Sequence, residues 1–537
     1  MTKQITVECL IYDSKKETYS VQIKYSHGSE RISEMEIAYS DLTNPKGLAK
    51  LFSDKMGPEY NGDTTELVKS LQSKVKSAPE KIRAHRYGLQ DDRRTFVSPS
   101  RVYKNGKRIH GYIKPNFLVE KNDRLGSTSE WRAISKYMLL SSSLTFAVCA
   151  AFAPPIMRLK PNLLSRSFAL VGNTRGGKST VLRAAASVAG HKPEAELPTF
   201  NFSEAGSAEL FESYNGLLLP LDDLEAQGGN AKAKHENAHR FAFLYADGQS
   251  KKNSKYAIEA GSTSHATWRG LCLVPAEFGP DALAKRAGEI RQPGAAQRFI
   301  QIPVGEHVFD LDHREHVDVS SLCAGISKIV EQNYGCPLNT FLRKFSNDLK
   351  KSRAELLKYM SELSDDLAKE SQTEQFRSVA DYFSMIGAAG MLASDFRIVE
   401  VKHSHIKAVM KRLFLRAVKY LDAERYEVRR GLKKLRTLAK KAPRISKGKQ
   451  VSADCQAYVL KENGKSTLVI ARKEYNKTFD DRVQGRLVAK HESLSGKISA
   501  RAPNPLPASL DWAAEQIKWP IKGGVKRRWS ICIEIEN

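Results

Sequence analysis

Residues 172–179, GNTRGGKS, constrain the fold of this chain more than any other part of its sequence. They satisfy the pattern G-x-x-x-x-G-K-[ST], with the apolar run FALV before them and the helix-forming run STVLRAAASVAG continuing from their last residue. The glycines allow backbone N–H groups to close around phosphates at the positive end of the following helix. The pattern therefore predicts a strand, a phosphate-binding loop and a helix in direct succession.

The predicted loop defines a set of candidate nucleotide-binding residues. Lys178 is expected to reach the β and γ phosphates of ATP, and Ser179 to hold Mg²⁺. A glycine-rich turn that carries a lysine by coincidence is the structural alternative. The residues expected to bind the nucleotide are Gly172, Asn173, Thr174, Arg175, Gly176, Gly177, Lys178, Ser179 and Thr180.

A pair of aspartates ends the next apolar strand, in the segment GLLLPLDDLEA. Asp222 is placed to ligate Mg²⁺ through its water shell, and Asp223 stands where the residue that orients the attacking water is expected. Glutamate is commoner at that position, so Asp223 has a shorter reach and predicts slower turnover. Glu225 lies just beyond the pair. The alternative is a solvated acidic loop after a strand.

Two further charged residues follow later strands. Glu277 comes directly after RGLCLVPA, where ring ATPases place a residue that senses the γ-phosphate. Arg298 stands immediately before the apolar run FIQIPV, where such ATPases present an arginine to the nucleotide of the neighbouring subunit. Arg291 is a competing candidate for that role. A solvated carboxylate and a surface arginine are the structural alternatives.

The segment His235–His239 matches H-E-x-x-H, a pattern that on a helix can bind zinc. Lys234 and Arg240 flank it, whereas a zinc-protease helix is buried among uncharged neighbours. We therefore expect a polar helix face here. The loop that follows carries Lys251, Lys252 and Lys255, which are expected to contact nucleic-acid phosphates; a solvated surface loop is an equal alternative.

The alternation of apolar strands with helices predicts an α/β fold, a P-loop NTPase core of AAA+-like type with a parallel sheet. The C-terminal part is expected to be a small α+β domain, for which a winged helix is one candidate arrangement. The expected regions are an N-terminal α+β domain at 1–130, the ATPase core at 131–335, a helical region at 336–449 and the C-terminal domain at 450–537.

The net charge of +26 indicates a polyanionic partner, either a nucleic acid or an anionic membrane. The long uncharged run at 137–157 contains three consecutive serines and Pro154–Pro155, so we expect a buried helix and no membrane partner. Residues 425–449 hold eleven Lys or Arg against one acidic residue, and thus carry ten of the 26 charges. Lys433, Lys434 and Arg436 in this tract are predicted to contact DNA.

The order of these segments resembles the mobile-element and phage proteins grouped as domain of unknown function 927, whose members are treated as helicase-like AAA+ ATPases. The resemblance is strongest from about 130 to 400. This chain has Asp223 where the family usually has Glu. It also has VPAE, ending at Glu277, where the family usually has small polar residues before the Glu. Both departures put the rate of hydrolysis in doubt. The similar segments include FALVGNTRGGKSTVLRAAASVAG, LLLPLDDLEA, TWRGLCLVPAEF and QRFIQIPV.

The resemblance implies a hexamer in a bacterial cytoplasm that replicates a phage, plasmid or genomic island. Seven scattered cysteines without a C-x-x-C pair fit a reducing compartment. We expect a ring-forming motor that acts on single-stranded or forked DNA, with priming left to a separate primase. The alternatives are a DNA-dependent ATPase that loads or signals in anti-phage defence without unwinding, and a DNA-binding scaffold locked by its nucleotide.

Overall fold

The computed structural model forms two compact units, residues 1–421 and 422–537. The described residues are 5–13, 17–27, 31–56, 64–110, 112–113, 123–250, 266–289, 291–310, 318–369, 374–421, 437–446, 449–462, 465–471, 474–475, 514–521 and 524–535.

A four-stranded parallel sheet forms the centre of the first unit, in the order β11-β12-β10-β13. Its strands read as continuous apolar runs because helices cover both faces of a parallel sheet. The mixed α/β fold with a parallel sheet expected from the sequence is confirmed. The strands are β10 (Arg166–Val171), β11 (Leu218–Pro220), β12 (Leu271–Ala276) and β13 (Phe299–Pro303).

Two helices next to this sheet correspond to the phosphate-loop segment and to the long uncharged run of the sequence. Helix α6 (Lys178–Ala189) begins at the lysine of the GNTRGGKS segment and contacts α5 (Ser142–Phe152). Every residue of α5 is buried. A break precedes α5, where the Ser141 hydroxyl accepts a hydrogen bond from the Leu144 N–H at 3.0 Å. Among the helices that the structure describes, none combines the length and apolarity needed to cross a bilayer.

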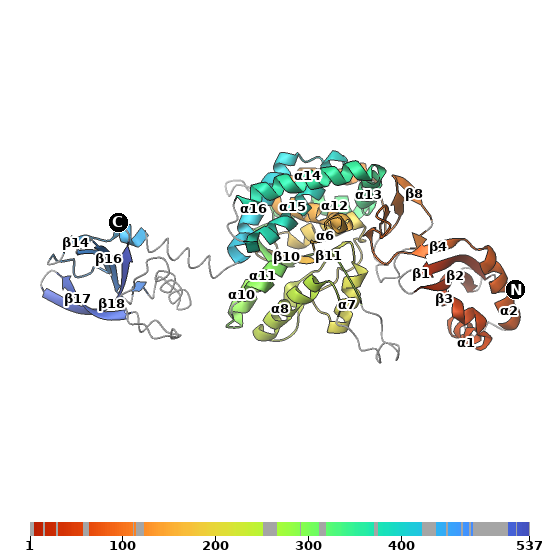
Figure 1. Cartoon of the computed structure of the whole chain (residues 1–537), viewed down its shortest axis with the longest axis horizontal. Coiled ribbons are helices and arrows are strands. Elements are labelled where there is room, and N and C mark those ends of the chain that lie inside the picture. Colours follow the sequence, from red (N-terminus) through yellow and green to blue (C-terminus); the bar gives the residue numbers. More distant parts are fainter. Residues whose placement is uncertain are drawn as a thin grey trace. The chain divides into compact units, whose positions relative to one another are not determined.

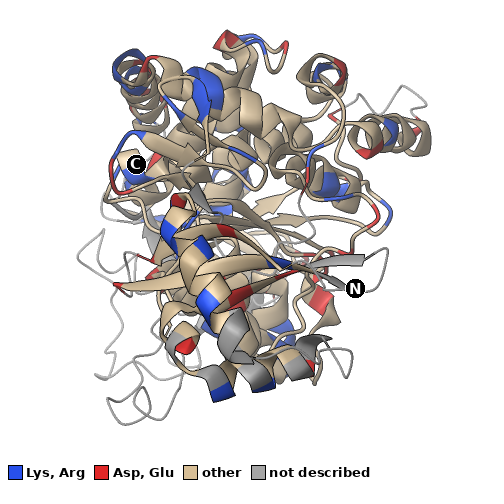
Figure 2. Cartoon of the chain, turned by 90° about the vertical axis from the view of Figure 1, so that its right-hand side faces the viewer, with Lys and Arg blue, Asp and Glu red and all other residues tan. Residues whose placement is uncertain are grey.

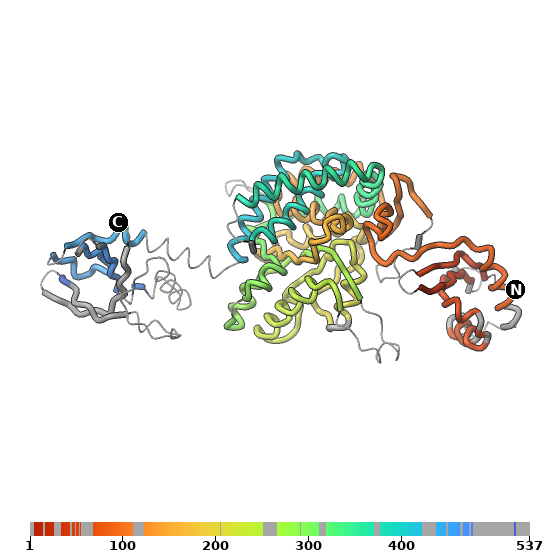
Figure 3. The backbone as a smooth tube through the Cα atoms, in the orientation of Figure 1, coloured from red at the N-terminus to blue at the C-terminus, as the bar shows by residue number. Residues whose placement is uncertain are grey.

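The remaining helices of the core gather in two groups, at the lower and upper sides of the unit in Figure 1. In the upper group α14, α15 and α16 contact one another and lie side by side (Figure 3). The lower group is α7 (Glu204–Ser213), α8 (Ala231–Asp247), α10 (Pro280–Arg286) and α11 (Pro293–Arg298). The upper group is α12 (Val319–Gln332), α13 (Cys336–Asn347), α14 (Leu349–Ala368), α15 (Glu374–Asp395) and α16 (His403–Leu421).

The N-terminal region contains two sheets. The first has the order β3-β2-β1-β4-β9, packs against two helices and has its own apolar core. Its elements are β1 (Thr6–Asp13), β2 (Thr18–His27), β3 (Arg31–Ala38), α1 (Pro45–Met56), α2 (Thr64–Ser77), β4 (Glu80–Arg83) and β9 (Tyr112–Ile113).

The second N-terminal sheet joins the main core. Phe96 of this sheet packs edge-on against Phe345 of α13, with ring centroids 5.5 Å apart. Gly88 lies so close to the 3-10 helix η5 (Pro154–Leu159) that a Cβ there would be 2.4 Å from the Pro155 oxygen. The strands are β5 (Gly88–Leu89), β6 (Thr95–Val97), β7 (Val102–Lys104) and β8 (Lys107–Ile109).

The described part of the second unit contains a short helical segment at 437–441 and a five-stranded sheet in the order β14-β15-β16-β18-β17. Most of residues 472–513 lies outside the described residues, and the winged helix stays a prediction. The strands are β14 (Arg444–Ser446), β15 (Ala457–Glu462), β16 (Lys465–Ala471), β17 (Ala514–Ile521) and β18 (Gly524–Ile535).

Candidate nucleotide site

The GNTRGGKS segment forms a loop between the end of β10 at Val171 and the start of α6 at Lys178. The Lys178 ammonium lies inside this loop and donates hydrogen bonds to the carbonyl oxygens of Gly172, at 2.7 Å, and Asn173, at 2.5 Å. The first N–H groups of a helix have no acceptor within the helix. The loop therefore brings a cation and free N–H donors together at the carboxyl edge of the sheet.

The glycines of this loop are required by close packing behind it. A Cβ on Gly176 would lie 2.9 Å from the Glu306 carbonyl oxygen, in the segment that follows β13. Gly177 has φ 85°, and a Cβ there would lie 2.9 Å from the Cys323 sulfur of α12. Both positions therefore exclude larger residues, and the loop keeps a concave backbone surface that fits a phosphate group.

The side chains of the loop differ in their surroundings. The Thr174 hydroxyl donates a hydrogen bond of 2.5 Å to the carboxylate of Glu277, which follows β12. Arg175 and Ser179 are exposed. Burial raises the pKa of the Cys323 thiol, and a hydrogen bond with Thr180 opposes that effect. Thr180 thus contacts α12, whereas Ser179 is accessible to a ligand.

The acidic segment after β11 lies at the same edge of the sheet, with β12 between it and the loop. Asp222 is half-buried and forms a parallel bridge with Thr199, in which its N–H donates to the Pro198 oxygen and its carbonyl oxygen accepts from the Phe200 N–H. Asp223 is exposed and has φ 53°, a left-handed conformation that is uncommon outside glycine. Its carboxylate accepts a hydrogen bond from the Glu225 N–H at 3.0 Å, which stabilises this turn.

Glu225 joins the acidic segment to the neighbouring strand, a role that its sequence pattern does not predict. Its Oε1 accepts hydrogen bonds from the backbone N–H groups of Glu277, at 3.0 Å, and Phe278, at 2.7 Å. Burial raises the pKa of Glu225, and nearby Asp223 raises it further. The available signal was a third carboxylate two residues after Asp223.

Electrostatic interactions connect the loop to both glutamates. Burial lowers the pKa of Lys178, and the negative charges of Glu277 and Glu225 oppose that effect. Glu277 is exposed, and Glu225 is half-buried. The structure therefore brings Lys178, Thr174, Glu277 and Glu225 into one connected polar site.

The two arginines considered for a neighbouring subunit have different environments. Arg291 is 6% exposed; it pairs with Asp281 at 2.8 Å and donates to the carbonyl oxygen of Phe299. Arg298 is half-buried at the end of α11, with its guanidinium 4.6 Å from the centroid of the Phe243 ring. Arg291 is therefore held inside its own subunit, whereas Arg298 has no carboxylate partner among the described residues.

The H-E-x-x-H segment lies on α8. The rings of His235 and His239 are 6.2 Å apart, and His239 packs on Phe243 at 5.0 Å. Burial and the neighbouring His239 lower the pKa of His235. In the part of the chain that the structure describes, no group of three His, Cys, Asp or Glu side chains is placed to hold a metal ion.

The residues predicted to contact nucleic acid lie outside the described residues: Lys251, Lys252, Lys255, Lys433, Lys434 and Arg436.

Two comparisons with known proteins find matches. Residues 1–262 match the family described as Domain of unknown function (DUF927), a span that includes the loop and the acidic segment. The resemblance stated from the sequence is confirmed there. A solved structure named "SCCmec type IV Cch - active helicase" has a TM-score of 0.61 and 13% identity, covering 99% of this chain and 93% of that one. At this identity the likeness is one of fold. No curated protein matches the sequence significantly.

Proposed function

From the family match over residues 1–262, we propose that this protein is an ATP-dependent, ring-forming motor that acts on DNA. Its core is a P-loop NTPase of AAA+-like type, and its role is that of a replicative helicase of a phage, plasmid or genomic island. The helicase-named structure with the same fold supports this class of activity.

The strand order is the observation that carries the proposal. Strand β12 lies between β10, which leads into the loop, and β11, which leads into the acidic pair. Three strand ends therefore face one space: Lys178 comes from the first, Asp222 and Asp223 from the second, and Glu277 from the third. A triphosphate in the loop would extend into this space, where charge stabilisation and water positioning are needed.

The residues present fit ATP and Mg²⁺. The glycine backbone and Lys178 would hold the phosphates, while the exposed Ser179 hydroxyl would ligate Mg²⁺ and the Asp222 carboxylate would hold it through its water shell. When bound, Mg²⁺ neutralises charge on the phosphates. Asp223 would orient the attacking water, and Glu277 would sense the γ-phosphate through its contact with Thr174.

The ring and its DNA contacts form the outer part of the proposal. Arg298 would complete the site of the neighbouring subunit in a hexamer, since it has no carboxylate partner among the described residues. The lysines at 251, 252 and 255 would contact DNA in the pore, and the basic tract would add affinity through Lys433, Lys434 and Arg436. A separate primase would supply primers.

A DNA-dependent ATPase that loads or signals without unwinding is the second candidate. Asp223 favours it, because this exposed residue occupies a position where the longer glutamate is usual. If Asp223 supports no hydrolysis at all, the protein would instead be a DNA-binding scaffold locked by its bound nucleotide.

Steady-state ATP hydrolysis, with and without single-stranded DNA, tests the proposal. Wild-type protein should hydrolyse ATP faster with DNA, and Lys178→Ala should abolish turnover. Lys192→Ala is a matched control because Lys192 follows α6 outside the loop. If wild-type turnover is no higher than that of Lys178→Ala, both ATPase functions are excluded and only the nucleotide-locked scaffold remains. Displacement of a strand from a forked duplex then separates a helicase from a signalling ATPase.

A further inference from the structure

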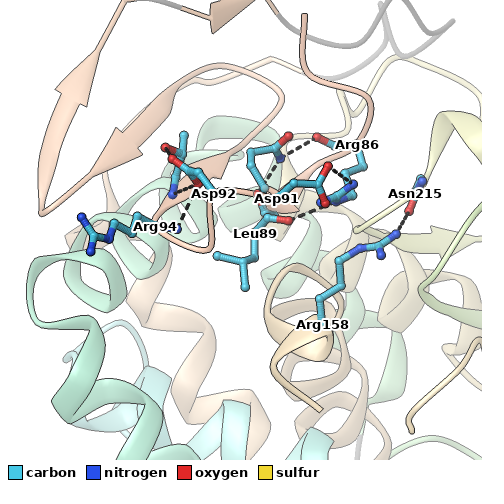
Figure 4. Close-up of polar contacts among 10 residues, drawn as sticks. Arg86, Leu89, Asp91, Asp92, Arg94, Arg158 and Asn215 are labelled. Atoms are coloured by element: carbon cyan, nitrogen blue, oxygen red, sulfur yellow. Dashed lines mark hydrogen bonds and ion pairs between the residues drawn. The ribbon is translucent and has the colours of Figure 1, made fainter. Parts of the chain in front are cut away.

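Three arginines converge at the amino edge of the sheet, opposite the phosphate loop. Arg158 lies on η5, Arg269 lies two residues before the start of β12, and Arg86 lies two residues before the start of β5. The amino edge is fixed by the register, in which Arg166 of β10 pairs with Leu271 of β12. Figure 4 shows Arg86 and Arg158 in this cluster.

Asn215, just before β11, brings the three segments together. Its side-chain oxygen accepts hydrogen bonds from the Arg269 N–H at 3.1 Å and from the Arg158 guanidinium at 3.5 Å (Figure 4). Its backbone oxygen accepts a hydrogen bond of 2.8 Å from the N–H of Tyr87, the residue after Arg86. The arginines are thus held near one another by the backbone of three distant segments.

The positive charges of the cluster are only partly compensated. The pKa of Arg158 is lowered to about 10, mainly by burial. The positive charges of Arg86 and Arg269 also lower this pKa, whereas the Asp91 carboxylate raises it. Asp91 pairs with Arg86 through both carboxylate oxygens, although its own side chain is 88% exposed. The Arg86 and Arg158 guanidinium groups therefore share the charge of one solvent-exposed carboxylate, and Arg269 adds a third positive charge beside them.

Arg158 differs from its neighbours in its lack of structural contacts. Arg269 donates to the Pro161 carbonyl oxygen at 2.9 Å. Arg166, on the same edge, stacks on the Tyr382 ring at 4.7 Å and donates to the Ser165 oxygen at 2.9 Å. Arg158 makes only the long contact with Asn215 among the described residues. Its guanidinium therefore keeps N–H donors from which an external anion could accept hydrogen bonds, and such an anion would offset the cost of burying the charge.

We propose that Arg86, Arg158 and Arg269 form a phosphate-binding site for the backbone of a nucleic-acid strand. Guanidinium groups match phosphate oxygens because their N–H donors lie in a planar fork. In the free protein the exposed Asp91 carboxylate occupies the place of the phosphate on Arg86. The inference rests on the proposed action on DNA and adds a contact on the edge of the sheet that faces away from ATP.

The charge of the whole chain favours a nucleic acid over a small anion. Lys and Arg number 86 against 60 Asp and Glu, so the net charge of the chain attracts a polyanion. Figure 2 shows Lys and Arg on several helices of this view, interspersed with Asp and Glu. General attraction therefore brings the strand to the protein, and the arginine cluster supplies a defined contact.

Fluorescence anisotropy of a labelled single-stranded oligonucleotide, titrated at several salt concentrations, tests the site. Arg158→Gln should weaken binding about tenfold and reduce the salt slope by about one. Asp91→Asn should strengthen binding, because it removes the competing carboxylate. Arg94→Gln is the matched control: it removes the same charge from the Asp91 turn, and Figure 4 shows its side chain directed away from Arg86 and Arg158. It should change affinity by less than about twofold.

The outcomes separate this inference from the proposed function. Wild-type protein that does not bind the oligonucleotide would overturn both. Wild-type binding with equal losses in Arg158→Gln and Arg94→Gln, or no gain in Asp91→Asn, would overturn the site alone. Inorganic phosphate that binds without competing with the oligonucleotide would also overturn it. Thermal unfolding of each variant shows whether weaker binding reflects a lost contact or a lost fold. Arg158→Lys, which keeps the positive charge, serves the same purpose.

Discussion

The hydroxyl of Thr174 donates a hydrogen bond of 2.5 Å to the carboxylate of Glu277, and so joins the tip of the phosphate loop to the end of β12. The backbone N–H of Glu277 in turn donates to Glu225. Loop, middle strand and acidic segment are therefore connected by side-chain contacts at one edge. These hydrogen bonds would transmit a change in the loop on nucleotide binding to all three strand ends.

Replacing Glu277 by Gln should separate nucleotide binding from hydrolysis. The amide can still accept from Thr174, but it removes a negative charge near Lys178 and the phosphates. We expect ATP affinity to stay equal or rise a few-fold, while turnover falls by about 10²-fold. A fluorescent ATP analogue reports binding, and steady-state hydrolysis reports turnover. Unchanged turnover would show that Glu277 is only a solvated carboxylate.

Asp223→Asn and Glu225→Gln should behave differently. Asp223 is the proposed water-orienting group, so its variant should lose turnover by about 10²–10⁴-fold with binding intact. Glu225→Gln keeps an oxygen that can accept from Glu277 and Phe278, whereas Glu225→Ala leaves both N–H groups unpaired. We expect only Glu225→Ala to lower the free energy of unfolding, by about 1–3 kcal/mol. If Glu225→Gln abolishes turnover and Asp223→Asn does not, the two roles must be exchanged.

The raised pKa of Glu225 makes a prediction for the pH dependence of stability. Because burial disfavours its ionised form in the folded state, the group binds protons more readily when folded than when unfolded. Its contribution to the free energy of unfolding therefore grows as the pH falls through the raised folded pKa toward the ordinary value of 4.5. Denaturant unfolding of wild type and Glu225→Gln should show this difference. Parallel pH profiles would contradict it.

Much of the core followed from local patterns, whereas its long-range contacts did not. The strand, loop and helix around Lys178 depend on neighbouring residues, so spacing and apolar runs sufficed. The contact of Glu225 with Glu277 and Phe278 requires β12 to lie beside β11. No local sequence pattern predicts this order of the strands. The cluster of Arg86, Arg158 and Arg269 likewise joins segments that are far apart in sequence.

Arg291→Ala and Arg298→Ala should affect different properties. Arg291 is buried against Asp281, so its loss leaves an uncompensated charge and should cost about 3–5 kcal/mol of unfolding free energy. Arg298 lies half-buried on Phe243, and its loss should cost much less. Chemical denaturation measures both. Equal destabilisation would mean that Arg298 is a structural residue like Arg291.

The role of Arg298 across a subunit interface can be tested by mixing two inactive variants. Arg298→Ala keeps an intact phosphate loop, and Lys178→Ala keeps the arginine. In a mixed ring some interfaces therefore pair the intact loop of one subunit with the arginine of the next, and ATP hydrolysis should return in part. The expected loss for each variant alone is at least about 10³-fold. A mixture as inactive as its components, after verified subunit exchange, would show that Arg298 does not act in trans.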